Sequence, residues 1–326
     1  MDEKGSTRYA VDIDAGNKVV DDIREAVEST HDDNVVSEWG SFAGCMRLKP
    51  IIKAYDDPVL VSSVDSVGSK ILLALQWNQL DEIGTDLVHH CINDILVQGA
   101  FPTAFLDYVA CGRLDPSQAT RLVKSIASAC KYHGIRLMGG ETAEIRDMYR
   151  PGAMDIAGTI LGMAERSEIP QRNWVQPDDL VYAQASNGFH TNGFTMVLDY
   201  LDQCPENIQK QLLEPHPCYK NSIARLMLKD FPIHGMVHIT GGGLVDNPTR
   251  ALPPELSMHF DRTWKIPDVI QWIIQASGMT LKEARRTFNM GLGFLIIVPH
   301  WVQPGDDWFR VGHIEKRQAD AVVFEC

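Results

Sequence analysis

Short apolar runs alternate with longer helical patterns along the first half of the chain. Three β-branched or apolar runs predict buried strands at residues 58–64, 103–110 and 135–138. Apolar side chains at helical spacing predict helices at 83–100 and 115–132, and a similar stripe begins at Val11. A further strand at 155–165 precedes a passage with Pro170, Pro177 and mixed polar residues. We expect the domain boundary in that passage, giving domains of residues 1–168 and 169–326.

The second half repeats this alternation. Strands are predicted at residues 180–185, 236–239, 293–298 and 321–324. Helices are predicted from 194 to 201 and at 219–229, 267–276 and 281–287. The whole pattern predicts an α+β protein.

The strand at 58–64 runs into a polar turn that carries candidate chemistry. Asp65 can hold a divalent cation, Gly68 allows a close backbone approach, and Lys70 can neutralise an anion. These residues are suited to a phosphate group with its Mg²⁺. The turn lacks the GxxxxGK[ST] order of a P-loop, so a solvated turn at a strand end is the alternative interpretation.

Two other glycine-rich stretches resemble this turn in character. Residues 139–144, GGETAE, follow a predicted strand and present acidic side chains, which suggests one site shared with the Asp65 turn. Residues 241–243 are three glycines before a predicted helix. They can cradle an anion, or they can serve close packing.

The predicted helix at 83–100 has an unusual polar face. At 100° per residue, Asp86, His90, Asn93 and Asp94 fall on one side, and that side lacks Lys and Glu. The face can be the wall of a cavity or an ordinary surface, and both interpretations remain open. Asp86 and Asp94 are separated by roughly 12 Å along the helix, so they cannot share an ion. His89 and His90 are interpreted as structural.

Charge and cysteine usage narrow the class of protein. The chain has 43 acidic and 30 basic residues and a net charge of −13, which argues against nucleic acid as a partner but allows a small phosphorylated substrate. Seven scattered cysteines without CxxC pairing predict reduced thiols and a cytoplasmic protein. No apolar run approaches the roughly 18 residues of a membrane span, so we expect no membrane partner.

A series of motifs in fixed order resembles one enzyme family. The series comprises VDIDAGN at 11–17, PVLVSSVDSVGSK at 58–70, IGTDLVHHCINDILVQGA at 83–100, GGETAE at 139–144, SNGFHTNGF at 186–194, ITGGG at 239–243 and RTFNMGLG at 286–293. It resembles the phosphoribosylformylglycinamidine cyclo-ligases, also called aminoimidazole ribonucleotide synthetases. An ordered series of this length is far more specific than any single motif.

The resemblance implies a two-domain synthetase fold with an N-terminal α/β domain and a C-terminal α+β domain. N-terminal strands would pair across a homodimer to close a shared barrel. The resemblance also implies ATP-dependent closure of formylglycinamidine ribonucleotide to aminoimidazole ribonucleotide in purine synthesis. The amide oxygen would be phosphorylated and then displaced by the substrate's own nitrogen. ATP and Mg²⁺ would be required, with K⁺ as a further cation.

The same resemblance assigns roles to individual residues. By position in the family motifs, the metal ligands would be Asp65, Asp94 and Glu141. Phosphate would be met by Asp65, Gly68, Lys70, Gly241, Gly242 and Gly243, and the catalytic residues would be Lys70, His190 and Asn192.

The chain departs from the family pattern in places that bear on ATP. Where the family has a glycine-rich loop before the first strand, residues 37–44 include Glu38, Trp39 and Phe42, and Ser66 replaces a glycine. Bulk and negative charge predict weaker ATP binding there. Two alternatives follow: another ATP-using enzyme of the same superfold, similar to thiamine monophosphate kinase or selenophosphate synthetase, or a catalytically silent paralogue.

Overall fold

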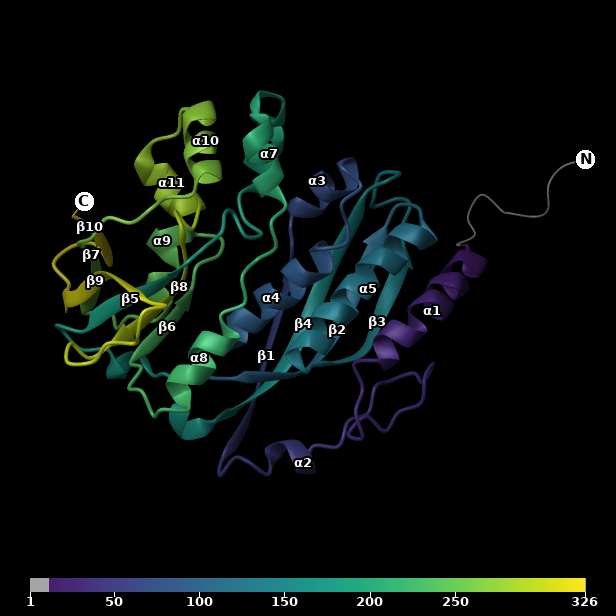
Figure 1. Cartoon of the computed structure of the whole chain (residues 1–326), viewed down its shortest axis with the longest axis horizontal. Coiled ribbons are helices and arrows are strands. Elements are labelled where there is room, and N and C mark those ends of the chain that lie inside the picture. Colours follow the sequence, from purple (N-terminus) through teal and green to yellow (C-terminus); the bar gives the residue numbers. More distant parts are fainter. Residues whose placement is uncertain (1–11, 326) are drawn as a thin grey trace, which may run out of the picture.

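The computed structural model describes residues 12–325, so Val11 lies outside the described residues. Two sheets lie beside each other, each with helices against it (Figure 1). The strands of the first sheet fall within residues 58–165 and those of the second within 180–324. Within the described part of the chain, no helix has the length and apolar character needed to cross a bilayer.

The N-terminal sheet has four strands in the order β1 (Pro58–Ser66), β4 (Met154–Glu165), β2 (Phe101–Cys111) and β3 (Arg136–Glu144). The β2–β3 pair is parallel, and β4 is antiparallel to both of its neighbours. One face is covered by α4 (Ile83–Leu96) and α5 (Pro116–His133), with α1 (Ile13–Glu28) packed beside α5. The Asp115 carboxylate accepts backbone hydrogen bonds at the start of α5, which fixes that end of the helix.

The opposite face of this sheet presents apolar side chains to solvent. Leu60 and Val64 on β1 are 62% and 66% exposed, and Leu106 and Tyr108 on β2 are also exposed. Alternation along a strand explains this pattern, since the residues between them face α4 and α5. No helix of the described chain covers these four residues, so the sheet is buried on only one side.

Of the two turns predicted from glycines, the one at residues 139–144 is wrong and the one after the first strand begins two residues later than predicted. Residues 139–144 continue strand β3 and pair with β2, so they form no turn. Gly140 is explained by packing, because a Cβ there would lie 2.3 Å from the Asp107 carboxylate. Strand β1 continues through Asp65 to Ser66, the turn forms at Gly68 and Ser69 with Gly68 at a φ of 54°, and Lys70 begins α3 (Lys70–Gln76).

The C-terminal sheet has six strands in the order β10 (Val322–Phe324), β7 (Leu256–Phe260), β9 (Phe309–Lys316), β5 (Leu180–Ala185), β8 (Leu292–Val298) and β6 (Gly235–His238). Strand β8 is buried throughout, as its uninterrupted apolar sequence predicts. Strands β7 and β9 were not predicted, because polar residues alternate with their apolar ones. The remaining helices are α2 (Lys49–Ile52), α6 (Phe194–Asp199), α7 (Glu206–Leu212), α8 (Lys220–Met227), α9 (Gly243–Asp246), α10 (Asp268–Ser277) and α11 (Leu281–Thr287).

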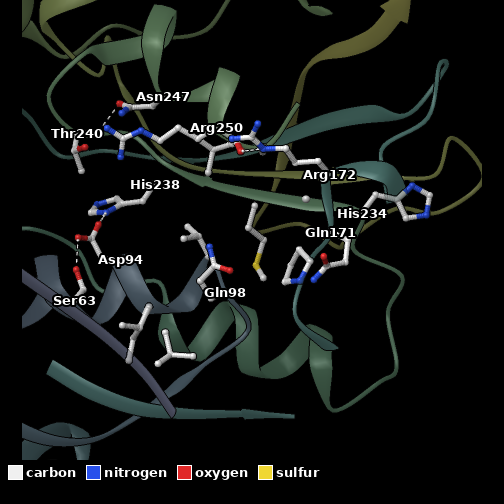
Figure 2. Close-up of a pocket in the computed structure, with 18 of the residues that line it drawn as sticks. Ser63, Asp94, Gln98, Gln171, Arg172, His234, His238, Thr240, Asn247 and Arg250 are labelled. Carbon is white, nitrogen blue, oxygen red and sulfur yellow. Dashed lines mark hydrogen bonds and ion pairs between the residues drawn. The ribbon is translucent and has the colours of Figure 1, made fainter. Parts of the chain in front are cut away.

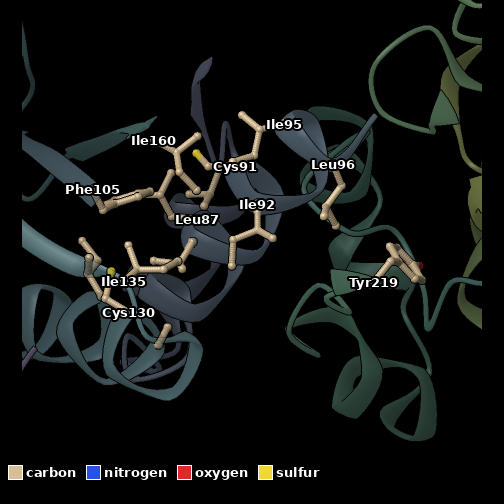
Figure 3. Packing of buried hydrophobic residues seen from close by; sticks show 14 of the residues in the cluster. Leu87, Cys91, Ile92, Ile95, Leu96, Phe105, Cys130, Ile135, Ile160 and Tyr219 are labelled. Atoms are coloured by element: carbon tan, nitrogen blue, oxygen red, sulfur yellow. The ribbon is translucent and has the colours of Figure 1, made fainter. Parts of the chain in front are cut away.

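Helix α4 lies at the centre of the molecule. Its apolar side packs Leu87 and Cys91 toward Phe105 of the first sheet, and Leu96 points toward Tyr219 of the C-terminal domain (Figure 3). All five side chains belong to one cluster of buried residues that crosses the two domains. The two domains therefore share part of a core, and α4 is the element that connects them.

Candidate active site at the domain interface

The polar face of α4 is buried against the C-terminal domain. Asp86 accepts a hydrogen bond from the backbone N–H of His216 at 2.8 Å. Asn93 accepts one from the N–H of Tyr219 at 3.0 Å and donates one to the carbonyl of Pro217 at 2.8 Å. The sequence left two interpretations open for the polar face of α4, the wall of a cavity and an ordinary surface. Over most of its length this face is neither of them. It positions the 214–219 segment.

Lys70 belongs to the same buried network. Its side chain is fully buried, and its ammonium group donates to the Asp86 carboxylate and to the carbonyl of Glu214, both at 2.8 Å. The ring of Phe194 lies 5.6 Å away. Lys70 thus joins α3 to α4 and to the C-terminal domain, and the predicted contact with phosphate stays a prediction.

Asp65 and Asp94 are brought together around His90. The Nε2 atom of His90 lies 2.7 Å from Asp65 and 4.0 Å from Asp94, while its Nδ1 atom meets the hydroxyl of Thr191 at 2.8 Å. Burial opposes a charge on His90, but the hydrogen bond and charge of Asp65 outweigh burial and raise the pKa of the imidazole. Burial also opposes ionisation of Asp65, yet the His90 contact holds its pKa below the ordinary value.

Asp94 is held from two further sides. His238 Nδ1 lies 2.8 Å from one carboxylate oxygen, and the hydroxyl of Ser63 donates to the other at 3.1 Å (Figure 2). Burial disfavours the charge, but the hydrogen bonds from His238 and Ser63 and the charges of the neighbouring histidines together lower the pKa of Asp94. Asp94 is therefore an oriented, ionised carboxylate at the junction of the domains.

A stack of histidines continues from this point. The ring of His190 stacks on His216 with centroids 3.8 Å apart, and His238 Nε2 lies 3.1 Å from His216 Nε2. His190 has a positive φ of 59° and is 2% exposed. Neither of its ring nitrogens has a hydrogen-bond partner among the described residues, and burial lowers its pKa well below the ordinary range. Buried polar atoms without partners are typical of a site completed by a bound molecule.

The cleft cavity opens beside Asp94 and has a volume of about 340 Å³. His238 and Thr240 line one side of it, the guanidinium group of Arg250 lies beside Thr240, and Arg172 approaches from the other direction (Figure 2). The Nε atom of Arg172 donates to the carbonyl of Arg250 at 2.8 Å, which fixes one arginine against the other segment. The cavity combines an acidic end with a cationic end, and its volume suits a small anionic ligand.

The predicted glycines lie close to this interface. Gly68 faces the backbone of Thr191, and a Cβ at Gly241 would lie 3.3 Å from the amide oxygen of Asn192. The 190–192 loop therefore lies between two predicted sites: the turn after β1 on one side and Gly241 on the other. Gly243 has a packing role, because a Cβ there would lie 2.4 Å from a carbonyl oxygen of α11. Anion binding at Gly241, Gly242 and Gly243 stays a prediction.

A second hollow, the loop-covered cavity, lies in the N-terminal domain and has a volume of about 730 Å³. Residues 37–44 and α1 cover strand β3 here, with Glu38, Trp39, Asp107 and Glu141 among the lining residues. Burial raises the pKa of Asp107 to about 7.

Glu141 does not join Asp65 and Asp94 within one chain. Strands β1 and β3 are the two edges of the sheet, which are separated by roughly 14 Å at ordinary strand spacing. Glu141 is also in register with Tyr108, whose side chain is on the exposed face, whereas Asp65 contacts α4 on the other face. The prediction of one site shared by both acidic stretches is wrong for a single chain.

Sequence reasoning missed four residues of the domain interface: His216, His238, Arg172 and Arg250. Of these four, only His238 had a detectable signal in the sequence, because it lies immediately before the ITGGG motif. Arg172 lies in the passage between the domains, where polar composition indicated only a linker.

Comparison with solved structures identifies the fold. HypE from E. coli matches with a TM-score of 0.67 at 15% identity, covering 95% of this chain and 94% of that one. Thiamine-monophosphate kinase from Stenotrophomonas maltophilia matches with a TM-score of 0.65 at 16% identity, covering 94% and 96%. At this identity the likeness concerns the fold alone, a two-domain α+β architecture.

Sequence comparison is more specific. The N-terminal domain of the AIR synthase related proteins matches residues 43–164, and their C-terminal domain matches residues 176–324. The phosphoribosylformylglycinamidine cyclo-ligase of Chromobacterium violaceum is 39% identical, covering 94% of both chains. That of Nitratidesulfovibrio vulgaris is also 39% identical, covering 90% of this chain and 87% of the relative. The resemblance predicted from the motifs is confirmed: the chain belongs to the phosphoribosylformylglycinamidine cyclo-ligase family.

Proposed function

We propose that the chain catalyses ATP-dependent closure of formylglycinamidine ribonucleotide to aminoimidazole ribonucleotide in purine biosynthesis. The observation that carries this conclusion is 39% identity to a cyclo-ligase over 94% of both chains. Both domains, and hence both walls of the interface, are included in that match. The enzyme is accordingly an ATP-dependent ligase that forms a carbon–nitrogen bond.

The cleft cavity is suited to the phosphorylated substrate. Arg172 and Arg250 offer planar guanidinium groups, which match a phosphate better than a single ammonium group. With the phosphate at that end, the amide would extend toward Asp94 and His190. The neutral imidazole of His190 can then accept a proton from the attacking nitrogen, and the Asn192 amide can orient the reacting group.

ATP is needed because an amide oxygen is a poor leaving group. Transfer of the γ-phosphoryl group to that oxygen forms an imidate phosphate, and attack by the substrate's nitrogen then releases phosphate. A fold relative, the hydrogenase maturation protein HypE, has been solved in complex with ATP and matches with a TM-score of 0.63 at 18% identity. That likeness supports ATP use by this fold.

The residues around Asp94 fit Mg²⁺. The ionised carboxylates of Asp65 and Asp94 and the hydroxyl of Ser63 are the hard oxygen donors that this cation prefers. Mg²⁺ would supply positive charge against the transferring phosphoryl group. Glu141 would hold a cation at the loop-covered cavity, away from this pair. A contact of Lys70 with phosphate requires its ammonium group to leave Asp86 when the nucleotide binds.

We also propose a homodimer that buries the exposed face of the N-terminal sheet. Leu60, Val64, Leu106 and Tyr108 form an apolar strip there. Light scattering should give about twice the chain mass of 36.4 kDa. Val64→Asp, which places a charge in the strip, should shift the protein toward monomer, and a wild-type monomer at every concentration would contradict the dimer.

One assay separates the activity from its alternatives. The purified protein is incubated with formylglycinamidine ribonucleotide, MgATP and K⁺, and the products are identified. Aminoimidazole ribonucleotide with ADP and free phosphate supports the cyclo-ligase. A stable phosphorylated product indicates a small-molecule kinase instead. Absence of product, together with no heat of MgATP binding in calorimetry, indicates a silent paralogue.

A further inference from the structure

Three metal-ligand side chains gather on the side of α4 that faces α5. His89 lies on α4, His133 is the last residue of α5, and Cys218 lies in the segment that precedes α8. One ligand atom from each lies within 4.8 Å of the other two. The two Nε2 atoms are 2.8 Å apart, and the rings meet edge to face. The proposed reaction uses none of these residues.

The hydrogen bonds orient His89 as a ligand. Its Nδ1 atom contacts the backbone carbonyl of His216, and a carbonyl oxygen can only accept, so Nδ1 carries the proton. In the neutral ring Nε2 then offers its lone pair toward His133. A histidine that donates one ring N–H to a carbonyl and directs the other nitrogen to an ion is the usual arrangement at metal centres.

The other histidine groups in the described chain are less suitable. His190 and His216 are stacked with an interplanar angle of 22°, so their in-plane lone pairs cannot converge on one ion. The group of His90, Asp94 and His238 belongs to the active site. In the group of His259 and His313, every ring nitrogen already contacts a carboxylate or hydroxyl.

We propose that His89, His133 and Cys218 bind one divalent transition-metal ion of the Zn²⁺ class. Two imidazoles and a thiolate are borderline-soft ligands that favour Zn²⁺ or Co²⁺ over Mg²⁺. Zn–N bonds of about 2.0–2.1 Å require the two nitrogens to separate to about 3.3 Å, a small rotation of each ring. Cys218 is partly exposed, which leaves a fourth position for water.

Proton balance on binding is simple. The S–H bond of Cys218 breaks, a metal–sulfur bond forms, and the proton goes to solvent. His133, which donates from Nε2 to His89 in the metal-free protein, keeps one proton by moving it to Nδ1. No oxidant or reductant is needed.

Such an ion would connect the two domains. Cys218 follows the residues that meet Asp86 and Asn93, and Lys220 donates to the carbonyl of His133 at 2.7 Å nearby. The metal would tie this segment to α4 and α5 on the side of α4 opposite the cleft cavity. Its expected role is structural, holding the domains at a fixed separation.

The test is a Co²⁺ titration of metal-free, full-length protein, followed by Zn²⁺ displacement. One Co²⁺ per chain should bind with a thiolate-to-cobalt charge-transfer band in the near ultraviolet, and excess Mg²⁺ should not displace it. Cys218→Ser should abolish the band, and His133→Gln should weaken binding at least about tenfold. Cys45→Ser, which alters an exposed cysteine, is the matched control and should keep the band.

Several outcomes would overturn the proposal. Absence of a thiolate band in the wild-type protein does so without any variant. A band that persists in Cys218→Ser, or that disappears in Cys45→Ser, assigns the metal to another sulfur. Wild-type affinity in His133→Gln removes the histidine from the site, and this variant decides the matter if Cys218→Ser does not fold.

Discussion

The cleft cavity and the loop-covered cavity lie beside the two opposite edge strands of the N-terminal sheet, β1 and β3, and they are built differently. In the cleft, Asp94, His238 and Arg172 are each held by a hydrogen bond to a residue distant in sequence. The loop-covered cavity is closed by α1 and by the nearby segment 37–44, whose Phe42 is fully exposed. The shape of the cleft cavity therefore depends on how the two domains pack against each other, whereas the shape of the loop-covered cavity depends on α1 and one local loop.

The largest effect on stability should follow from breaking the contacts that hold the two domains together. Lys70→Ala leaves the buried Asp86 carboxylate without its counter-charge, which should cost about 3–5 kcal/mol in the free energy of unfolding. Denaturant titration measures the loss. The double variant Lys70→Met, Asp86→Leu should recover much of the stability, since an apolar pair replaces the ions. A stable single variant would show that the ion pair does not hold the domains together.

Removing an acid from the cleft should affect rate more than stability. Asp94→Ala should lower kcat by about 10²–10³, because charge on the transferring phosphoryl group loses its Mg²⁺ ligand. Circular dichroism should stay close to wild type, and Tm should fall less than in Lys70→Ala, because only the His238 hydrogen bond across the interface is lost. The control is Asp81→Ala, which removes an exposed carboxylate paired with Arg121. Turnover close to wild type in Asp94→Ala would place the metal elsewhere.

A change at the cationic end of the cleft should act on substrate binding. Arg250→Ala removes one guanidinium group from the cavity, and a lost charge-assisted hydrogen bond of about 1.5–3 kcal/mol would raise the KM for the ribonucleotide at least about tenfold. The KM for ATP should change little. If the KM for ATP rises instead, the cleft holds the nucleotide and the two cavities exchange roles.

The smallest effect is expected at the loop. Glu38→Gly combined with Ser41→Gly removes a negative charge and restores the backbone freedom that lets amides approach phosphate. The KM for ATP should fall, with the KM for the ribonucleotide unchanged. Steady-state kinetics with each substrate varied in turn makes the measurement. An equal or higher KM for ATP would assign the loop to packing.

The sequence predicted what is local and missed what is made by docking. The strand before Asp65, the helix that carries Asp94 and the order of the family motifs could all be recognised, because period and short-range spacing encode them. Strands β7 and β9 were missed because their polar alternation has no strong apolar run. The prediction of one shared acidic site failed for another reason. Glu141 and Asp94 are both acidic residues of family motifs, yet they lie in different cavities.

The partners in the cleft could not be predicted for a physical reason. His238 contacts Asp94 across 144 residues of sequence, and Lys70 contacts the carbonyl of Glu214 across another 144. Such pairs depend on the relative placement of two sheets, which no local pattern specifies. Only the polar face of α4 indicated a contact with the C-terminal domain from the sequence, since it lacks the long charged side chains of a solvated helix.

The strand order of the N-terminal sheet has a consequence for synthesis on the ribosome. Strand β4 lies between β1 and β2 but is the last of the four to be made. At about 5–20 residues per second, roughly 5–20 seconds separate the emergence of β1 from that of β4. During that interval β1 has no neighbouring strand, β2 lacks the neighbour on the side that β4 will take, and the apolar side of α4 has an incomplete sheet to pack on. Chaperone demand should therefore peak before residue 165 leaves the exit tunnel and fall once β4 inserts.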